Sequence, residues 1–297
     1  MATTNDGLDE SAHPASADKR HRLARWLKGS GIEVGALHHP LAVPADARVT
    51  YVDRMTESEL RRHYPELEAE AFAPVTVIGN AEDLSAFADG SLDFVIANHL
   101  LEHLEDPIRA LQEFHRVLRR DGVLYLALPD ARVTFDRDRE LTSIDHLIGE
   151  YRSGTAPNRR AHYRDWALSV DKHRDPEAHA ARLDAMDYSI HFHVWLPDSF
   201  LDFLVEARRE AKLEFEVAAF APPESREDNE FILILLKGRI REVRLPPAGN
   251  AAAGAAALDR WQHLRARVRQ SPAGPILRPV YRLLRHGWPS RRSRATR

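Results

Sequence analysis

The stretch GNAEDLSAFADGSLDFVIANHLLEHLEDPIRALQEFHRVLRRDGVLYLALPD, residues 79–130, contains two apolar runs that flank one amphipathic pattern. The first run, SLDFVIAN, ends in a polar turn, and the second, GVLYLALP, is almost entirely apolar. Between the two runs, apolar residues recur at helical spacing: Ile108, Leu111, Phe114, Val117 and Leu118. Pro107 stands before this pattern and Gly122 after it, as at the two ends of a helix. This order predicts a strand, a helix and a second strand, with both strands parallel and buried.

Further strand and helix patterns lie on both sides of this stretch. Strands are expected at GIEVG (31–35), RVTYVDR (48–54) and PVTVIGN (74–80), and a short helix begins with the capping box of Thr56 and Glu59. Later, a helix is expected over 200–211 and strands over 213–220 and 229–238, which are antiparallel because a short turn joins them. We therefore predict an α/β fold, a Rossmann-like and mostly parallel sheet with a final antiparallel strand.

The chain divides into four predicted parts. Residues 1–20 are polar and acidic early, which predicts a disordered lead-in and neither a signal nor a transit peptide. Residues 21–240 hold the α/β domain. Within it, residues 136–195 lose the periodicity and carry six histidines, which indicates a helical cap inserted over the carboxyl edge of the sheet, where such folds bind ligands. Residues 241–258 form an Ala/Gly/Pro linker, and residues 259–297 a basic amphipathic tail.

Charge and composition exclude several classes of function. The net charge is -3, but the tail holds eleven arginines and one aspartate, which leaves about -13 on residues 1–258. An acidic body of this kind disfavours nucleic-acid binding. The absence of cysteine excludes disulfides, thiolate zinc sites and cysteine nucleophiles. The chain also has no apolar run of about 18 residues, the length that spans a membrane. Together these two observations favour a cytoplasmic protein. The tail is read either as a segment that contacts an anionic membrane or a partner protein, or as a loosely ordered extension.

The ordered features of residues 79–130 resemble the central part of class I S-adenosylmethionine-dependent methyltransferases, in the type 11 branch that has an LEH turn after the fourth strand. The shared features are the polar turn after strand three, Asp93 at the start of strand four, the LEHLEDP turn, the amphipathic helix and a strand that ends in proline. The match extends from about residue 30 to residue 238. It implies that residues 21–240 are a methyltransferase domain with S-adenosylmethionine as cofactor.

The resemblance also implies a cofactor site at the ends of the strands. Asp53 would accept hydrogen bonds from the ribose hydroxyls, and Gly35 would let the cofactor approach the backbone closely. The turn after strand three would contact the adenine, and His99 would face the methyl group. The residues assigned to the cofactor are Glu33, Gly35, Asp53, Asn80, Ala81, Glu82, Asn98 and His99.

The first loop departs from the family pattern. Leu37 stands where the family usually has a second glycine, and Pro40 and Pro44 disfavour the usual first helix, which we expect to be shortened or absent. The methionine end of the cofactor would then meet His38 or His39. We interpret the loop as a rebuilt site, and the alternative is a damaged, non-catalytic copy.

The cap carries the candidate catalytic residues. In the extended segment HFHVW, side chains alternate, so His191 and His193 would point the same way. They would serve as a metal pair or as a general base with an orienting partner, and the alternative is two histidines that stack on a polar surface or are hydrogen-bonded to the backbone. Asp130 and His146 are the other candidate bases, and no metal site is assigned. For Glu102 and His103 we favour a role in packing and in capping the next helix.

These patterns predict an enzyme that transfers a methyl group from S-adenosylmethionine to a hydroxyl or amine of a small molecule, such as a saccharide or another secondary metabolite. The alternative is a non-catalytic cofactor-binding or adaptor protein that docks a partner or a membrane through its basic tail. A nicotinamide-dependent oxidoreductase is disfavoured because the glycine-rich loop G-x-G-x-x-G is missing. The sequence does not predict the oligomeric state.

Overall fold

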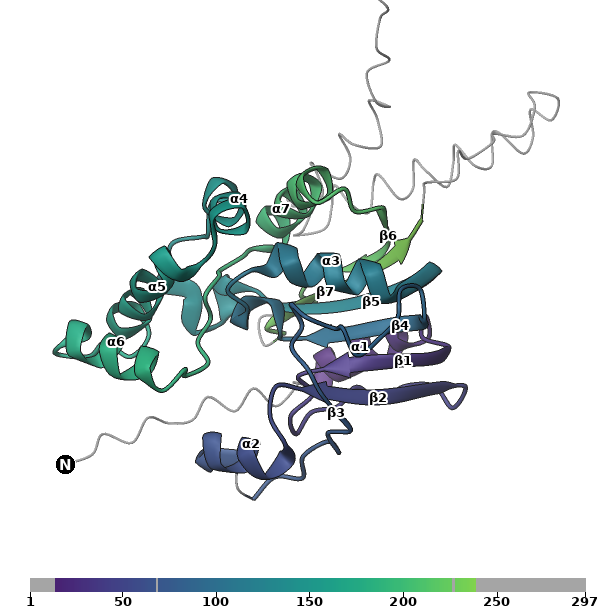
Figure 1. The fold of residues 1–297 in the computed structure, drawn as a ribbon, viewed down its shortest axis with the longest axis horizontal. Helices are drawn as coiled ribbons and strands as arrows, with labels where there is room; N and C mark the ends of the chain where they lie inside the picture. The colour runs from purple at the N-terminus through teal and green to yellow at the C-terminus, as the bar shows by residue number, and fades with distance from the viewer. Residues whose placement is uncertain (1–13, 68, 226–227, 239–297) are drawn as a thin grey trace, which may run out of the picture.

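The computed structural model describes residues 14–67, 69–225 and 228–238 of the chain (Figure 1). The strands are β1 (Gly29–Val34), β2 (Ala47–Asp53), β3 (Val77–Ile78), β4 (Leu92–Asn98), β5 (Leu118–Pro129), β6 (Phe215–Ala221) and β7 (Glu230–Lys237). The α-helices are α1 (Pro14–Ala24), α2 (Glu57–His63), α3 (Pro107–Val117), α4 (Ile144–Ser153), α5 (Ala156–Ser169), α6 (Pro176–Ala185) and α7 (Pro197–Glu210). Short 3-10 helices are η1 (Pro65–Leu67), η2 (Leu101–His103), η3 (Ala131–Val133) and η4 (Phe135–Asp138).

The strands form one sheet in the order β3-β2-β1-β4-β5-β7-β6. β1 to β5 are parallel, whereas β7 is antiparallel to both of its neighbours, β5 and β6. The predicted Rossmann-like sheet with a final antiparallel strand is therefore confirmed. The antiparallel strand β7 is the last strand of the described residues but lies in the interior of the sheet, which explains why its first six residues are buried.

Both faces of the sheet are covered. On one face, α3 and α7 pack on the strands through residues such as Phe114 and Phe200. On the other face, Leu27 and Leu41 lie in a core with residues of β4, β5 and β7. The described chain forms no helix between β1 and β2, as the two prolines there predict, so the loop itself covers the sheet where Leu41 is buried.

The residues around α3 explain why this helix begins where it does. Asp106 is the N-cap, and its side chain accepts a hydrogen bond from the backbone N–H of Arg109. Pro107 follows in the first helical turn, where a missing N–H costs nothing. The expectation that the LEH turn caps this helix is wrong, because the cap is Asp106 and the turn forms the separate short helix η2.

Helix α1 corrects one prediction. Residues 14–20 were expected to belong to a disordered lead-in, but they form the first turns of α1. Lys19 is 0% exposed and donates to both carboxylate oxygens of Asp228 at 2.7 and 2.6 Å. This partner lies 209 residues away, so the local sequence gives no sign of it. Residues 1–13, the linker and the basic tail lie outside the described residues.

Residues 136–195 form the expected helical insertion. α4, α5 and α6 lie in it, and Figure 1 shows α5 and α6 beyond α4 at one end of the molecule. The insertion has a small core of its own, in which Tyr163, Trp166, Leu183 and Phe192 are buried together. In the part of the chain that the structure describes, no helix is both long and apolar enough to cross a membrane.

Candidate functional site

The carboxyl ends of β1, β2 and β4 meet at one edge of the sheet. The parallel register sets Val34 beside Val52 and Glu33 beside Ile96. Because the strands run together, Gly35, Asp53 and Asn98 follow or end neighbouring strands at this edge. The fold therefore gathers the predicted cofactor residues of three strands in one place, as expected for ligand sites in open α/β sheets.

Glu33 ties the loop after β1 to the sheet. Its buried carboxylate accepts hydrogen bonds from the backbone N–H of Leu41 at 3.0 and 3.1 Å and from the side-chain amide of Asn98 at 3.3 Å. Burial raises the pKa of Glu33 to about 7, although these hydrogen bonds oppose the shift. The carbonyl oxygen of the Asn98 amide is buried and has no hydrogen-bond partner among the described residues, so it fits a ligand that donates a hydrogen bond there.

The loop keeps a glycine-like backbone even where its sequence departs from the family pattern. Gly35 has φ 71° and Leu37 has φ 45°, both in the left-handed region. The N–H of Gly35 donates to the carbonyl of Val52 at 2.9 Å, which holds the turn against β2. A Cβ at Gly35 would lie 3.1 Å from the side chain of Leu100, so a larger residue would crowd this turn. The turn geometry fits a cofactor that approaches the backbone closely.

β2, which ends in Asp53, and then β3 are the strands next to β1 in the sheet, so Asp53 and the turn after β3 lie on the same side of the site. Asp53 is 7% exposed, and burial raises its pKa despite the hydrogen bond from the N–H of Arg54 at 2.7 Å. The side-chain oxygen of Asn80 accepts from the N–H of Glu82 at 3.1 Å, so it holds the turn itself. Ala81 is buried, and a pocket opens along this turn and the residues after it.

Glu82 links this turn to the start of α3. Its carboxylate accepts a hydrogen bond from the backbone N–H of Asp106 at 3.3 Å. Burial raises the pKa of Glu82 to about 7. The carboxylate therefore connects the adenine side of the predicted site with the helix that follows the LEH turn.

His99 is held at the end of β4 by two acids. Its Nε2 donates to Glu230 at 3.0 Å, and its Nδ1 lies 3.5 Å from the Glu102 carboxylate. Glu230 also accepts from the guanidinium of Arg20, at 2.9 Å from its Nε. Burial would raise the pKa of Glu230, but His99 and Arg20 together lower it to about 2. The sequence analysis did not single out Arg20 or Glu230. The one signal was that Glu230, an acidic residue, begins the long apolar strand β7.

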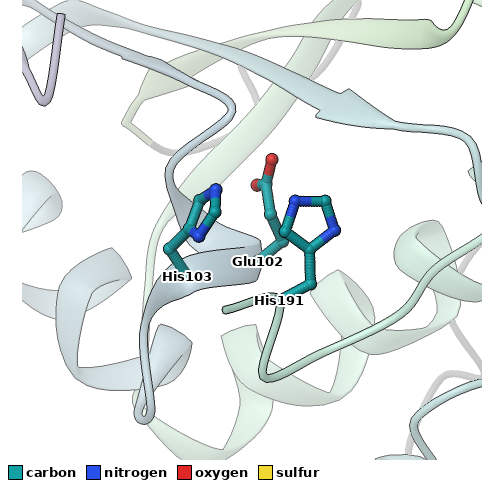
Figure 2. A group of neighbouring side chains, drawn as sticks. All are labelled: Glu102, His103 and His191. Atoms are coloured by element: carbon teal, nitrogen blue, oxygen red, sulfur yellow. The ribbon is translucent and has the colours of Figure 1, made fainter. Parts of the chain in front are cut away.

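Glu102, His103 and His191 converge into one group, in which Glu102 and His191 are buried and His103 is partly buried. Figure 2 shows the Glu102 carboxylate between the two imidazoles, and all three offer ligand atoms within 4.8 Å of one another. Nδ1 of His191 donates to Asp136 at 2.6 Å, and Nδ1 of His103 donates to the carbonyl of Ile190 at 3.0 Å. Burial holds the pKa of His103 well below its ordinary value. The group joins the LEH turn, η4 and the end of the cap.

A second group lies deeper in the cap. It consists of His146 and Glu150 from α4, His162 from α5, and His193. The two histidines that the sequence sets side by side fall into different groups, His191 with Glu102 and His193 with Glu150. Burial lowers the pKa of His193 to about 3, which keeps its imidazole neutral. Backbone N–H groups of Phe192 and His193 donate to the carbonyl of Glu102 and hold the segment that carries both histidines.

Asp130 lies beyond the end of β5 and is engaged locally. Its carboxylate accepts from the backbone N–H of Arg132 at 3.0 Å and from the Nε of the same residue at 2.9 Å. This arrangement caps the short helix η3 and pairs the carboxylate with a guanidinium. The contacts favour a structural role over that of a general base.

Comparisons with known proteins agree with this architecture. The sequence model of the methyltransferase-domain family matches residues 28–126. A malonyl-(acyl-carrier protein) O-methyltransferase of Laribacter hongkongensis is 33% identical over 155 residues, which cover 46% of this chain and 50% of that protein. A thiol S-methyltransferase of Homo sapiens is 34% identical over 89 residues, 28% of this chain and 34% of that protein. The chain thus spans half or less of these curated relatives.

Solved structures are also similar to this chain. One is a SAM-dependent methyltransferase from Aquifex aeolicus, 12% identical, with a TM-score of 0.41, which covers 75% of this chain and 89% of that one. Another, from Methanosarcina mazei, is 22% identical, with a TM-score of 0.37, and covers 72% and 94% of the two chains.

The sheet is that of an open α/β fold, in which ligands bind at the carboxyl edge that gathers the predicted cofactor residues. The family match then identifies residues 28–126 as a methyltransferase domain. This match agrees with the predicted family, enzyme class and cofactor.

Proposed function

We propose that this chain transfers the methyl group of S-adenosylmethionine to a hydroxyl group of a small molecule. The cofactor supplies an electrophilic methyl group. One observation carries the acceptor side of the proposal: the cap brings the hydrogen-bonded pair His191–Asp136 to the LEH turn, next to His99 at the end of β4.

The residues at the strand ends fit the cofactor. Asp53 offers a carboxylate where the ribose diol is expected, and the orphaned oxygen of Asn98 offers an acceptor near the loop after β1. Gly35 leaves the backbone accessible, and Leu37 preserves the backbone shape of the missing glycine. These features support a rebuilt site rather than a damaged one.

The base would come from the cap. A hydroxyl has a pKa far above 7, so its attack on a methyl group benefits from a neighbouring general base. We infer that His191 accepts this proton and that Asp136, which binds its Nδ1 at 2.6 Å, fixes the tautomer and orients the ring. An amine acceptor needs this base less, which is why we favour a hydroxyl.

The relatives widen the range of acceptors that is worth testing. One of the curated relatives is named for O-methylation and another for S-methylation. Both names concern methyl transfer, but the chain spans only part of each protein. We propose a small-molecule acceptor, with hydroxylated saccharides first and thiols and amines as comparison substrates.

The test is the formation of the demethylated cofactor in the presence of a panel of hydroxylated saccharides, thiols and amines. With the best acceptor, His191→Gln should lower kcat by roughly 100- to 10,000-fold, because general-base catalysis contributes about that much. Cofactor affinity should stay unchanged. A matched control is His173→Gln, which changes an exposed histidine in the same insertion and should leave kcat as it is.

Two results would contradict the proposal. If His191→Gln turned over at the wild-type rate, His191 would not be the general base. Turnover with amines or thiols but with none of the hydroxyl acceptors would replace the proposed acceptor class.

A further inference from the structure

The cap holds a group of four side chains that the proposed methyl transfer does not use. His146 and Glu150 lie one turn apart on α4, His162 lies on α5, and His193 lies in the segment before α7. We define these four residues as the cap cluster. We propose that the cap cluster binds one Zn²⁺ ion, which fastens the two helices and the segment to one another.

His146, Glu150 and His193 offer ligand atoms that all lie within 4.8 Å of one another, and His162 contacts both His146 and Glu150. Nε2 of His146 and Nε2 of His162 are 3.1 Å apart. The Glu150 carboxylate lies 3.0 Å from His162 and 3.2 Å from His146. Nε2 of His193 is 3.9 Å from the same carboxylate. Ligands bound tetrahedrally to zinc at about 2.0–2.1 Å are separated by about 3.3–3.4 Å, so small side-chain movements would complete the coordination.

The burial of these atoms also favours an ion. Glu150 is 1% exposed and His193 is 0% exposed at their side chains. Oε2 of Glu150 has no hydrogen-bond partner within the described part of the chain, although it lies 3.2 Å from Nε2 of His146 and 3.9 Å from Nε2 of His193. Buried polar atoms are nearly always bonded, so a buried carboxylate oxygen that is left unsatisfied among imidazoles points to a missing ligand.

The chemistry of the donor set selects the ion. Imidazole nitrogens suit zinc and its neighbours in the first transition row, whereas calcium and magnesium prefer sites made of oxygen alone. Three imidazoles and one carboxylate supply four ligands, the number found in closed structural zinc sites. His146 is 33% exposed, which gives the ion a path from solvent.

The position of the cap cluster indicates what the ion would stabilise. Nε2 of His193 lies 3.2 Å from the carbonyl of Glu105, two residues before the start of α3, and would exchange this hydrogen bond for the bond to the ion. Two residues earlier in the same segment, His191 contacts Asp136 in the group next to β4. An ion that holds His193 to α4 and α5 would therefore fix the cap in place over the end of the sheet.

A purely hydrogen-bonded cluster is the competing account, in which protons on the imidazoles neutralise Glu150. That account predicts that no divalent ion binds. The Glu102 group is a competing location for an ion, because its three ligand atoms also lie within 4.8 Å of one another. The experiment must separate all three outcomes.

Full-length protein treated with a chelator and dialysed is titrated with Zn²⁺ in a calorimeter, and the metal content of the purified protein is measured by mass spectrometry. We expect one ion per chain and a rise of several degrees in Tm, because an ion that binds only the folded state stabilises it. Glu150→Gln and His162→Gln should each weaken binding by roughly a hundredfold or more, since even partners of the ligands are worth about ten- to a hundredfold. Neither readout depends on methyl transfer.

The controls are Glu102→Gln, which alters the other group, and His173→Gln, which alters an exposed histidine of the same insertion. Both should bind zinc like the wild type. The proposal is overturned if the wild-type protein binds no zinc, or if Glu102→Gln abolishes binding while Glu150→Gln and His162→Gln retain it. Because the wild-type titration stands alone, a variant that fails to fold does not obscure the result.

Discussion

Leu37 adopts a left-handed backbone conformation, with φ 45°, in the loop that follows β1. Its carbonyl accepts a hydrogen bond from the N–H of Ala73 at 2.7 Å, so the surrounding structure fixes this conformation. For a residue with a Cβ, the left-handed region costs about 1–2 kcal/mol. The chain thus keeps the backbone of a glycine turn at the expense of local strain.

This strain can be tested by substitution. Leu37→Gly should change the free energy of unfolding by less than about 1 kcal/mol, because relief of strain offsets the greater entropy of glycine in the unfolded chain. Leu37→Val should lower it by about 1–2 kcal/mol, because β-branched residues tolerate positive φ worst. Urea unfolding of the three proteins measures the order. A Val variant as stable as the wild type would show that the turn is not strained.

At the scale of elements, α1 is attached to the start of β7 by a buried ion pair. Lys19 and Asp228 are each 0% exposed, and the ammonium also donates to the carbonyl of Glu230 at 2.7 Å. The next residue, Arg20, binds the Glu230 carboxylate, which in turn holds His99. Helix α1 therefore helps to hold the imidazole of His99, at the end of β4, through the carboxylate of Glu230.

Lys19→Met should lower the free energy of unfolding by about 3–5 kcal/mol, because it leaves the Asp228 carboxylate buried without its cation. Equilibrium unfolding in urea measures the change. The matched control is Lys28→Met, which replaces an exposed lysine near the end of the same N-terminal region and should cost less than about 0.5 kcal/mol. Equal effects of the two substitutions would mean that α1 is not held by the ion pair.

At the scale of the whole molecule, Glu230 makes stability depend on acid pH. Its pKa in the folded protein is about 2, against an ordinary value of 4.5, because His99 and Arg20 outweigh the opposing effect of burial. A depressed folded pKa contributes stability that is complete above the unfolded pKa and is lost as the pH falls from about 4.5 to about 2. The difference corresponds to about 3 kcal/mol.

Between about pH 5 and pH 3, the wild-type protein should therefore lose stability more steeply than Glu230→Gln, whose side chain does not ionise. At neutral pH the variant should be the less stable of the two. Urea midpoints measured across this range give both slopes. Parallel slopes would show that the Glu230 carboxylate does not carry this part of the acid sensitivity.

The periodicity of the sequence predicts the elements that local patterns control. The apolar runs give β4 and β5, the proline and apolar spacing give α3, and Pro40 and Pro44 explain the missing first helix. Contacts between distant segments were not predictable. The attachment of α1 and the separation of His191 from His193 depend on partners such as Asp228 and Glu150, whose positions only the folded chain determines.

The measurement that tests the central claim most directly is calorimetric titration with S-adenosylmethionine and its demethylated product. We predict that the wild-type protein binds both and that Asp53→Ala binds them roughly ten- to a hundredfold more weakly, since hydrogen bonds to a charged group are worth about 1.5–3 kcal/mol. Asp46→Ala, which removes an exposed carboxylate at the other end of the same strand, should bind like the wild type. No binding of either compound by the wild-type protein would contradict the account, and so would equal affinity in Asp53→Ala.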